Sequence, residues 1–128
     1  ECIRSLALSI SEKVYILSSH DRKYLHLSAV FACNFVNHCY EIAAEILHQH
    51  DIPFEVLQPL IDETARKIHM LSPRDAQTGP AVRYDKNVIE AQRNLLVNSP
   101  LWQEIYERMS ASIHRTAITN KPNHYDKL

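Results

Sequence analysis

One stretch of the chain carries hydrogen-bonding side chains in an apolar setting. Most residues between Leu27 and Leu47 are apolar, yet His26, Asn34 and Asn37 share one side of a helix at 100° per residue. An imidazole exchanges protons near neutral pH, and an amide both donates and accepts hydrogen bonds. An unpartnered buried polar group costs about 1–3 kcal/mol, so a helix, water or a ligand must meet these groups. They form either a ligand-facing site or, alternatively, a structural or solvent-facing polar stripe.

A second group of polar residues surrounds Gly79, the one glycine of the chain. Glycine is favoured where the backbone needs a positive φ or approaches another group closely. Thr78 and neighbouring backbone N–H groups can donate hydrogen bonds, and the Arg83 guanidinium can hold a carboxylate or phosphate with two bonds. Together with Gln77, these residues form either a binding loop for an anionic small molecule or a tight helix connection, with Arg83 in solvent or paired with Asp85.

Metal and thiol chemistry are not expected. His48 and His50 are two residues apart, so they do not share a helical face, and no third ligand is nearby. The three cysteines are odd in number and lack a CxxC spacing, which argues against a zinc site or a disulfide framework. We predict a reducing, cytoplasmic location and small core roles for Cys33 and Cys39.

Composition bounds the class of protein. The 128 residues fit one domain, and 14 basic against 15 acidic residues indicate no nucleic-acid or anionic-membrane partner. No apolar run approaches the roughly 20 residues that span a bilayer. Average usage would give roughly nine glycines, so a chain with one has no dinucleotide-binding loop of its own. Because Glu1 is not methionine, we expect a fragment or a processed domain.

Helical periodicity and helix-capping residues run through the chain. We predict an all-α fold, a helical bundle around a long central helix from Ser18 or Ser19 to about Gln49. That helix would be about 45 Å long and apolar around most of its circumference, so it should be buried. The remaining elements are predicted as a helix over Phe54–Leu71 that kinks or restarts at Pro59, a loop over 72–84, a helix from Asp85 to about Val97, and a last helix from Ser99.

The N-terminal residues do not fit a bundle. A helix over Cys2–Glu12 is followed by the β-prone run Val14–Leu17, and one helix with one strand cannot close a sheet. We predict that residues 1–17 are the end of a truncated α/β domain or a strap. Residues 18–118 then form the helical domain, and residues 119–128 a polar tail.

Three separated segments resemble one particular domain. They are the run from His26 to His38, the run Pro-Phe-Glu-Val-Leu-Gln-Pro-Leu-Ile from Pro53, and Gln-Thr-Gly-Pro-Ala-Val-Arg-Tyr-Asp from Gln77. From about Val14 to Ile113 the chain is similar to the helical C-terminal domain that follows a Rossmann-like domain in a bacterial family of predicted NADP oxidoreductases. That family looks like a distant relative of pyrroline-5-carboxylate reductase, ketopantoate reductase and 6-phosphogluconate dehydrogenase.

The resemblance implies roles for the polar groups. In the related dehydrogenases the corresponding helix carries Lys-x-x-Asn-Asn, in which the lysine moves a proton at the substrate oxygen and an asparagine holds the substrate. Asn34 matches the asparagine, but Phe31 replaces the lysine and Phe35 follows. His26 could replace the lysine as the acid, so the resemblance makes His26, Asn34 and Asn37 candidate catalytic residues and puts classical hydroxyacid dehydrogenation in doubt.

The resemblance also implies a function and an assembly. The chain would be the substrate-side and dimerisation domain of an NADP- or NAD-dependent oxidoreductase acting on a small anionic substrate. The homodimer would form through the helical domains, and the absent Rossmann-like domain would hold the nicotinamide, so the isolated chain should be inactive. The alternatives are a non-catalytic dimerisation or ligand-binding domain of a sensor-like protein, and a free-standing helical module.

Overall fold

A computed structural model describes residues 2–119, apart from the side chain of Cys2. Its regular elements are all helices, which confirms the predicted all-α class. The chain divides into two compact units, Glu1–Ile52 and Pro53–Leu128. Beyond Thr119, the predicted polar tail lies outside the described residues.

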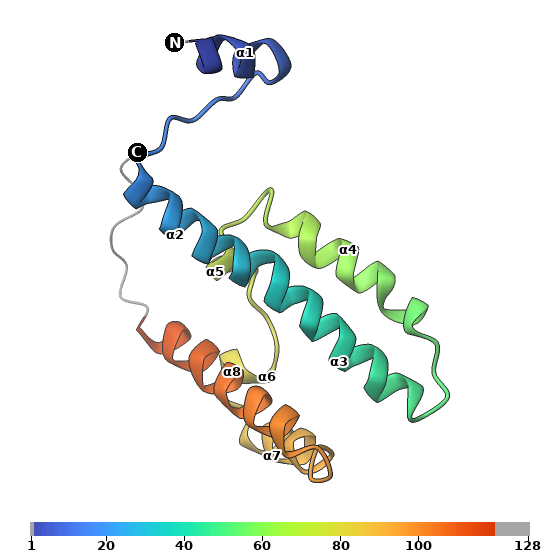
Figure 1. Ribbon diagram of the computed structural model, residues 1–128. Coiled ribbons are helices and arrows are strands. Elements are labelled where there is room, and N and C mark those ends of the chain that lie inside the picture. The colour runs from blue at the N-terminus through green and yellow to red at the C-terminus, as the bar shows by residue number, and fades with distance from the viewer. Residues whose placement is uncertain (1, 120–128) are drawn as a thin grey trace. The chain divides into compact units, whose positions relative to one another are not determined.

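The first unit consists of a short helix and a long helical rod. Helix α1 spans Cys2–Ile10, and the rod runs through α2 (Ser19–Ala29), the π-helical segment η1 (Val30–Phe35) and α3 (Val36–His48) without a break (Figure 1). The Ser18 hydroxyl accepts a hydrogen bond from the Asp21 amide at 3.1 Å, so the rod has the predicted N-cap. Its start and end agree closely with the prediction.

The strand predicted over Val14–Leu17 is not formed, and these residues have no regular secondary structure. A strand is stable only when a second strand accepts and donates its backbone hydrogen bonds. The described residues 2–119 provide no such strand. The β-prone side chains of this run therefore cannot determine its conformation alone.

The π-helical segment was not predicted. In a π-helix each turn takes in one more residue than in an α-helix, because the hydrogen bonds run from i to i+5. Residues after η1 are therefore turned by about one residue position, roughly 100°, from where a continuous α-helix would place them. The common face computed for His26 and Asn37 assumed that continuous helix.

The prediction of a buried central helix was wrong for the described chain. None of the residues in α2, η1 or α3 is buried. Leu27 is 53% exposed, Phe31 62% and Phe35 51%. The apolar side chains of the rod stay exposed because no other helix of the first unit packs along it.

The second unit starts with a 3₁₀ turn, η2 (Phe54–Leu57), and then α4 (Gln58–Lys67). Pro59 falls in the first turn of α4, where its missing N–H costs nothing, so of the two predicted outcomes the helix restarts rather than kinks. The predicted loop over 72–84 contains two one-turn helices, α5 (Pro73–Ala76) and α6 (Pro80–Arg83), each with proline in its first turn. The Ser72 hydroxyl caps α5 by accepting from the Asp75 amide at 3.1 Å.

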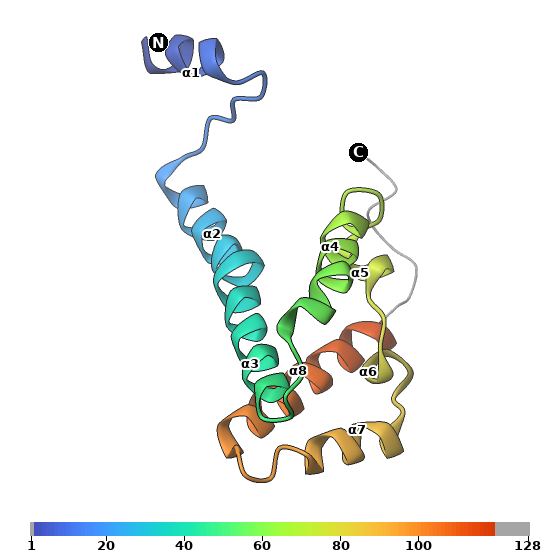
Figure 2. The ribbon, with the colours of Figure 1, turned by 90° about the vertical axis from the view of Figure 1, so that its right-hand side faces the viewer.

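Helices α6, α7 (Lys86–Asn94) and α8 (Pro100–Ile118) contact one another (Figure 2). Ala81 of α6, 6% exposed, is the one buried apolar residue among those described. An Arg93–Glu107 ion pair joins α7 to α8, and the Tyr106 hydroxyl donates to Gln92 Oε1 at 2.8 Å. This unit therefore depends on polar contacts between helices as well as on apolar packing.

Candidate functional site

The three predicted catalytic residues lie on the long rod, each on a different segment. His26 is in α2, Asn34 in the π-helical segment and Asn37 in α3, and all three are exposed. Among residues 2–119 none of their side chains has a hydrogen-bond partner. Their side chains are free to meet a ligand or a partner, so their catalytic role stays a prediction.

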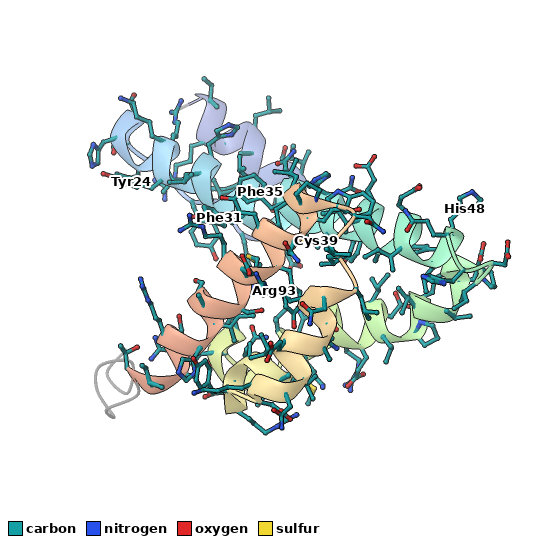
Figure 3. The ribbon with its side chains drawn as sticks, turned by 90° about the horizontal axis from the view of Figure 1, so that it is seen from below. Tyr24, Phe31, Phe35, Cys39, His48 and Arg93 are labelled. Carbon is teal, nitrogen blue, oxygen red and sulfur yellow. The ribbon has the colours of Figure 1, made fainter. Side chains whose placement is uncertain are left out.

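The π-helical segment also carries an aromatic pair. The rings of Phe31 and Phe35 pack edge to face with centroids 5.0 Å apart, and both side chains project from the rod (Figure 3). The predicted core cysteines Cys33 and Cys39 are exposed rather than buried, because nothing in the first unit covers the rod. π-Helical turns occur often at functional sites, which makes this segment the strongest candidate in the first unit.

The glycine turn of the second unit has the predicted unusual backbone. Gly79 has φ 109° and ψ 175°, a conformation that is essentially confined to glycine. A Cβ at this position would meet nothing within 4 Å, so the glycine is required for its φ and not for a close approach. Tyr84, which ends α6, is left-handed with φ 53°. The four-residue helix α6 therefore lies between two strained backbone positions.

A cavity of about 310 Å³ lies beside this turn within the second unit. Its polar lining consists of Arg74, Gln77, Ser112 and Thr116. The Gln77 side chain is held by a hydrogen bond from Nε2 to the Thr78 carbonyl at 3.1 Å. Small-molecule sites begin at about this volume and combine apolar walls with a few polar groups.

The cavity includes only part of the predicted binding loop. Gln77 lines it, whereas Thr78, Gly79 and Arg83 do not. The Arg83 side chain is exposed, and the alternative pairing with Asp85 is not formed, since Asp85 caps α7 by accepting from the Val88 amide at 3.3 Å. The binding role of Thr78, Gly79 and Arg83 remains a prediction.

Sequence reasoning missed Arg74, Ser112 and Thr116. Arg74 was assigned to an irregular loop, although Ser72 followed by Pro73 is a standard helix start that would have placed it on a helix. Ser112 and Thr116 are four residues apart on α8 and share a face. That spacing is visible in the sequence, but the element opposite that face is not.

Within the described range, no three histidine, cysteine, aspartate or glutamate side chains lie close enough together to hold a metal ion. Residues 2–119 also include no helix of the length and apolarity needed to cross a bilayer. They contain no strand leading into a glycine-rich turn, so they do not fit the phosphates of a dinucleotide. We therefore derive no hydride-transfer step from these residues.

The comparison with known families identifies the domain. Residues 1–113 match the family described as a domain of unknown function, DUF2520, and the chain belongs to this family. No curated protein matches the sequence.

A solved structure is also similar to the chain. It is the crystal structure of "putative NADP oxidoreductase BF3122 from Bacteroides fragilis", with 53% sequence identity and a TM-score of 0.82. The match covers 87% of this chain and 43% of the Bacteroides fragilis chain. This chain thus spans less than half the length of the protein it resembles.

Proposed function

We propose that this chain is the helical, substrate-side domain of an NADP-linked oxidoreductase, and that its substrate is a small anion. The 53% identity to the Bacteroides fragilis protein carries this proposal. At that identity the helical domain has the same architecture, and more than half of the neighbour lies outside the match. The unmatched part of the neighbour is long enough to contain a nucleotide-binding domain.

The division of labour follows from the residues present. A Rossmann-like site needs a strand, a glycine-rich turn and a helix that starts at the pyrophosphate. The whole sequence has a single glycine, so it has no such turn. We infer that the nucleotide, NADP rather than NAD, is held by another domain, and that this chain contributes groups that bind the substrate.

The rod supports self-association. Tyr24, Leu27, Phe31 and Phe35 follow one another at spacings of three or four residues, and each is more than half exposed. Large apolar side chains gathered on one surface are typical of protein–protein interfaces. We propose that a second copy of the chain covers this stripe in a homodimer, which would also bury Cys39 and other apolar groups of the rod.

The catalytic assignment rests on the rod as well. We propose that His26 acts as the acid in place of the lysine of the related dehydrogenases, and that Asn34 and Asn37 bind the substrate. Their exposure and their lack of protein partners support this assignment. Asn34 has the further support of lying in a π-helical turn.

The test uses the full-length protein and NADPH oxidation with a panel of small oxo acids. His26→Ala and Asn34→Ala should each lower kcat/KM by about 10²-fold or more while the Tm stays unchanged. His48→Ala is the control, because His48 is an exposed histidine on the same rod outside the proposed site. Unchanged turnover in both variants would contradict the catalytic assignment.

A second function has one observation in its favour. The described residues place no second titratable side chain in hydrogen-bond contact with His26, although acid–base catalysts are commonly oriented by such a partner. A sensor-like protein that binds nucleotide without turnover would need none. NADPH binding by the full-length protein without oxidation by any acid in the panel would favour the sensor.

A further inference from the structure

The cavity of the second unit has an uneven charge. One basic residue, Arg74, lines it, and none of its lining residues is acidic. The guanidinium has five N–H donors, so it can hold a carboxylate through two of them while it keeps other partners. A negatively charged ligand group is therefore favoured in this cavity over a neutral or positive one.

Two hydroxyls stand on the α8 wall of the cavity. The Thr116 hydroxyl donates to the Ser112 carbonyl at 3.1 Å, so its oxygen keeps a lone pair for an incoming donor. The Ser112 hydroxyl has no hydrogen-bond partner among residues 2–119 and can donate to an acid. The other polar groups that line the cavity, Arg74 and Gln77, lie on its α5 side.

The remaining walls are apolar. Pro73, Val82, Ile113 and Ala117 complete the lining, and none of them can form a hydrogen bond with its side chain. Short aliphatic groups fit such walls. The volume of about 310 Å³ is also at the small end for ligand sites.

The cavity is held open by structure around it. Val82 lies on α6, whose Ala81 is buried and whose C-cap residue, Tyr84, stacks on His114 of α8. The Gln77 amide is fixed by its bond to the Thr78 carbonyl. The α6 and α8 walls of the cavity are therefore joined before any ligand arrives.

We propose that this cavity binds a short aliphatic carboxylic acid as its carboxylate, with Arg74 as the anion-binding residue in place of the sequence-predicted Arg83. This inference goes beyond the proposed function, because His26, Asn34 and Asn37 belong to the first unit and none of them lines the cavity. It concerns a site formed by the second unit alone, so it can be tested without turnover.

The experiment is an NMR titration of the isotope-labelled full-length protein with butyrate and with its neutral analogue butyramide. We expect butyrate to shift the amide signals of residues 73–77 and 112–117 in a saturable way, with butyramide binding at least about tenfold more weakly. Equal binding of the two probes, or no butyrate-dependent shift at millimolar concentration, overturns the proposal.

Three variants locate the site. Arg74→Gln should weaken butyrate binding by about tenfold or more, and Ala117→Phe should abolish it by filling the cavity. Arg108→Gln is the matched control, because Arg108 is an exposed arginine of α8 with an 82% exposed side chain that does not line the cavity. The same spectra report folding, and if Arg74→Gln does not fold, Ala117→Phe decides. Wild-type affinity in the folded variants overturns the proposal.

Measuring NADPH binding as well as butyrate binding distinguishes failure of the cavity proposal from failure of the proposed function. NADPH binding with no butyrate binding overturns the cavity assignment alone. Butyrate binding that depends on Arg74, in a full-length protein that does not bind NADPH, overturns the oxidoreductase proposal alone.

Discussion

Tyr84 and His114 stack with ring centroids 4.1 Å apart and an interplanar angle of 19°. Tyr84 ends α6 in a left-handed conformation, which costs a non-glycine residue roughly 1–2 kcal/mol. The Lys86 ammonium lies 5.2 Å from the centroid of the same ring. The stack joins the C-cap residue of α6 to α8.

Two substitutions of His114 should have different effects on the free energy of unfolding. Its Nδ1 atom is buried and has no hydrogen-bond partner in the described part of the chain. His114→Phe keeps an aromatic ring on Tyr84 and removes that nitrogen, so the free energy of unfolding should stay the same or rise by up to about 1 kcal/mol. His114→Ala removes the stack and should lower it by about 1–2 kcal/mol.

Urea denaturation of the full-length protein measures both effects. Tyr15→Ala is the control, since Tyr15 is 78% exposed and has no ring partner among the described residues. Equal destabilisation by His114→Phe and His114→Ala would show that the imidazole itself matters, through a hydrogen bond to a group other than the described residues.

Every substitution of Gly79 should lower the free energy of unfolding by a similar amount. Its backbone conformation is strained for any L-residue, at about 1–3 kcal/mol, and the space around a Cβ is open. Gly79→Ala, Gly79→Ser and Gly79→Leu should therefore lower the free energy of unfolding alike. Thr78→Ala, beside it, should change stability by less than about 0.5 kcal/mol. A cost that grows with side-chain size would contradict this account.

The ion pair between Glu63 and Arg66 should lower the pKa of the Glu63 carboxyl. Arg66 donates from Nε and from an Nη atom to the two carboxylate oxygens, each at 2.9 Å, and holds the pKa of Glu63 below the ordinary glutamate value. A carboxyl with a lowered folded-state pKa contributes stability above its unfolded pKa, and that contribution is lost as pH falls through the folded value. Carboxyl NMR titration should show the lowered pKa, and Arg66→Gln should raise it. An identical Glu63 titration in the variant would mean that the pair does not persist in solution.

The apolar stripe of the rod predicts the oligomeric state. The full-length protein should sediment as a dimer, and Phe31→Glu should convert it to a monomer, because an unpaired carboxylate cannot be buried in an apolar interface. Phe31→Leu keeps the apolar surface and should remain dimeric. The variant Glu41→Lys changes an exposed charge on the same rod and serves as the control. A dimer that survives Phe31→Glu would place the interface elsewhere.

The helices were predictable because their signals are local. Ser18 before the rod and Asp85 before α7 cap as expected, and Pro59 and Pro100 fall in first turns, because capping and proline effects depend on neighbours in sequence. The one-turn helices α5 and α6 were missed because four residues show no periodicity. The strand at Val14–Leu17 was expected from side-chain preference, but strand formation depends on a partner.

The candidate site could be predicted only in part. The sequence left a positive φ or a close backbone approach as the reason for a glycine at position 79, and the structure shows the positive φ. Gln77 lines a cavity, and its binding role stays a prediction. Arg74, Ser112 and Thr116 come together only through the packing of α8 against α6, a contact between residues about 30 positions apart. The π-helical segment at Asn34 could not be predicted, because its residues also fit the periodicity of a continuous α-helix.

NADPH titration of the full-length protein, followed by nucleotide fluorescence, tests the central claim most directly, with the isolated 128-residue chain beside it. The full-length protein should bind saturably in the micromolar range, and the isolated chain should show no saturable binding. Equal, saturable binding by the isolated chain would contradict the assignment of this domain to the substrate side, and no binding by either would contradict its membership of an NADP-linked enzyme.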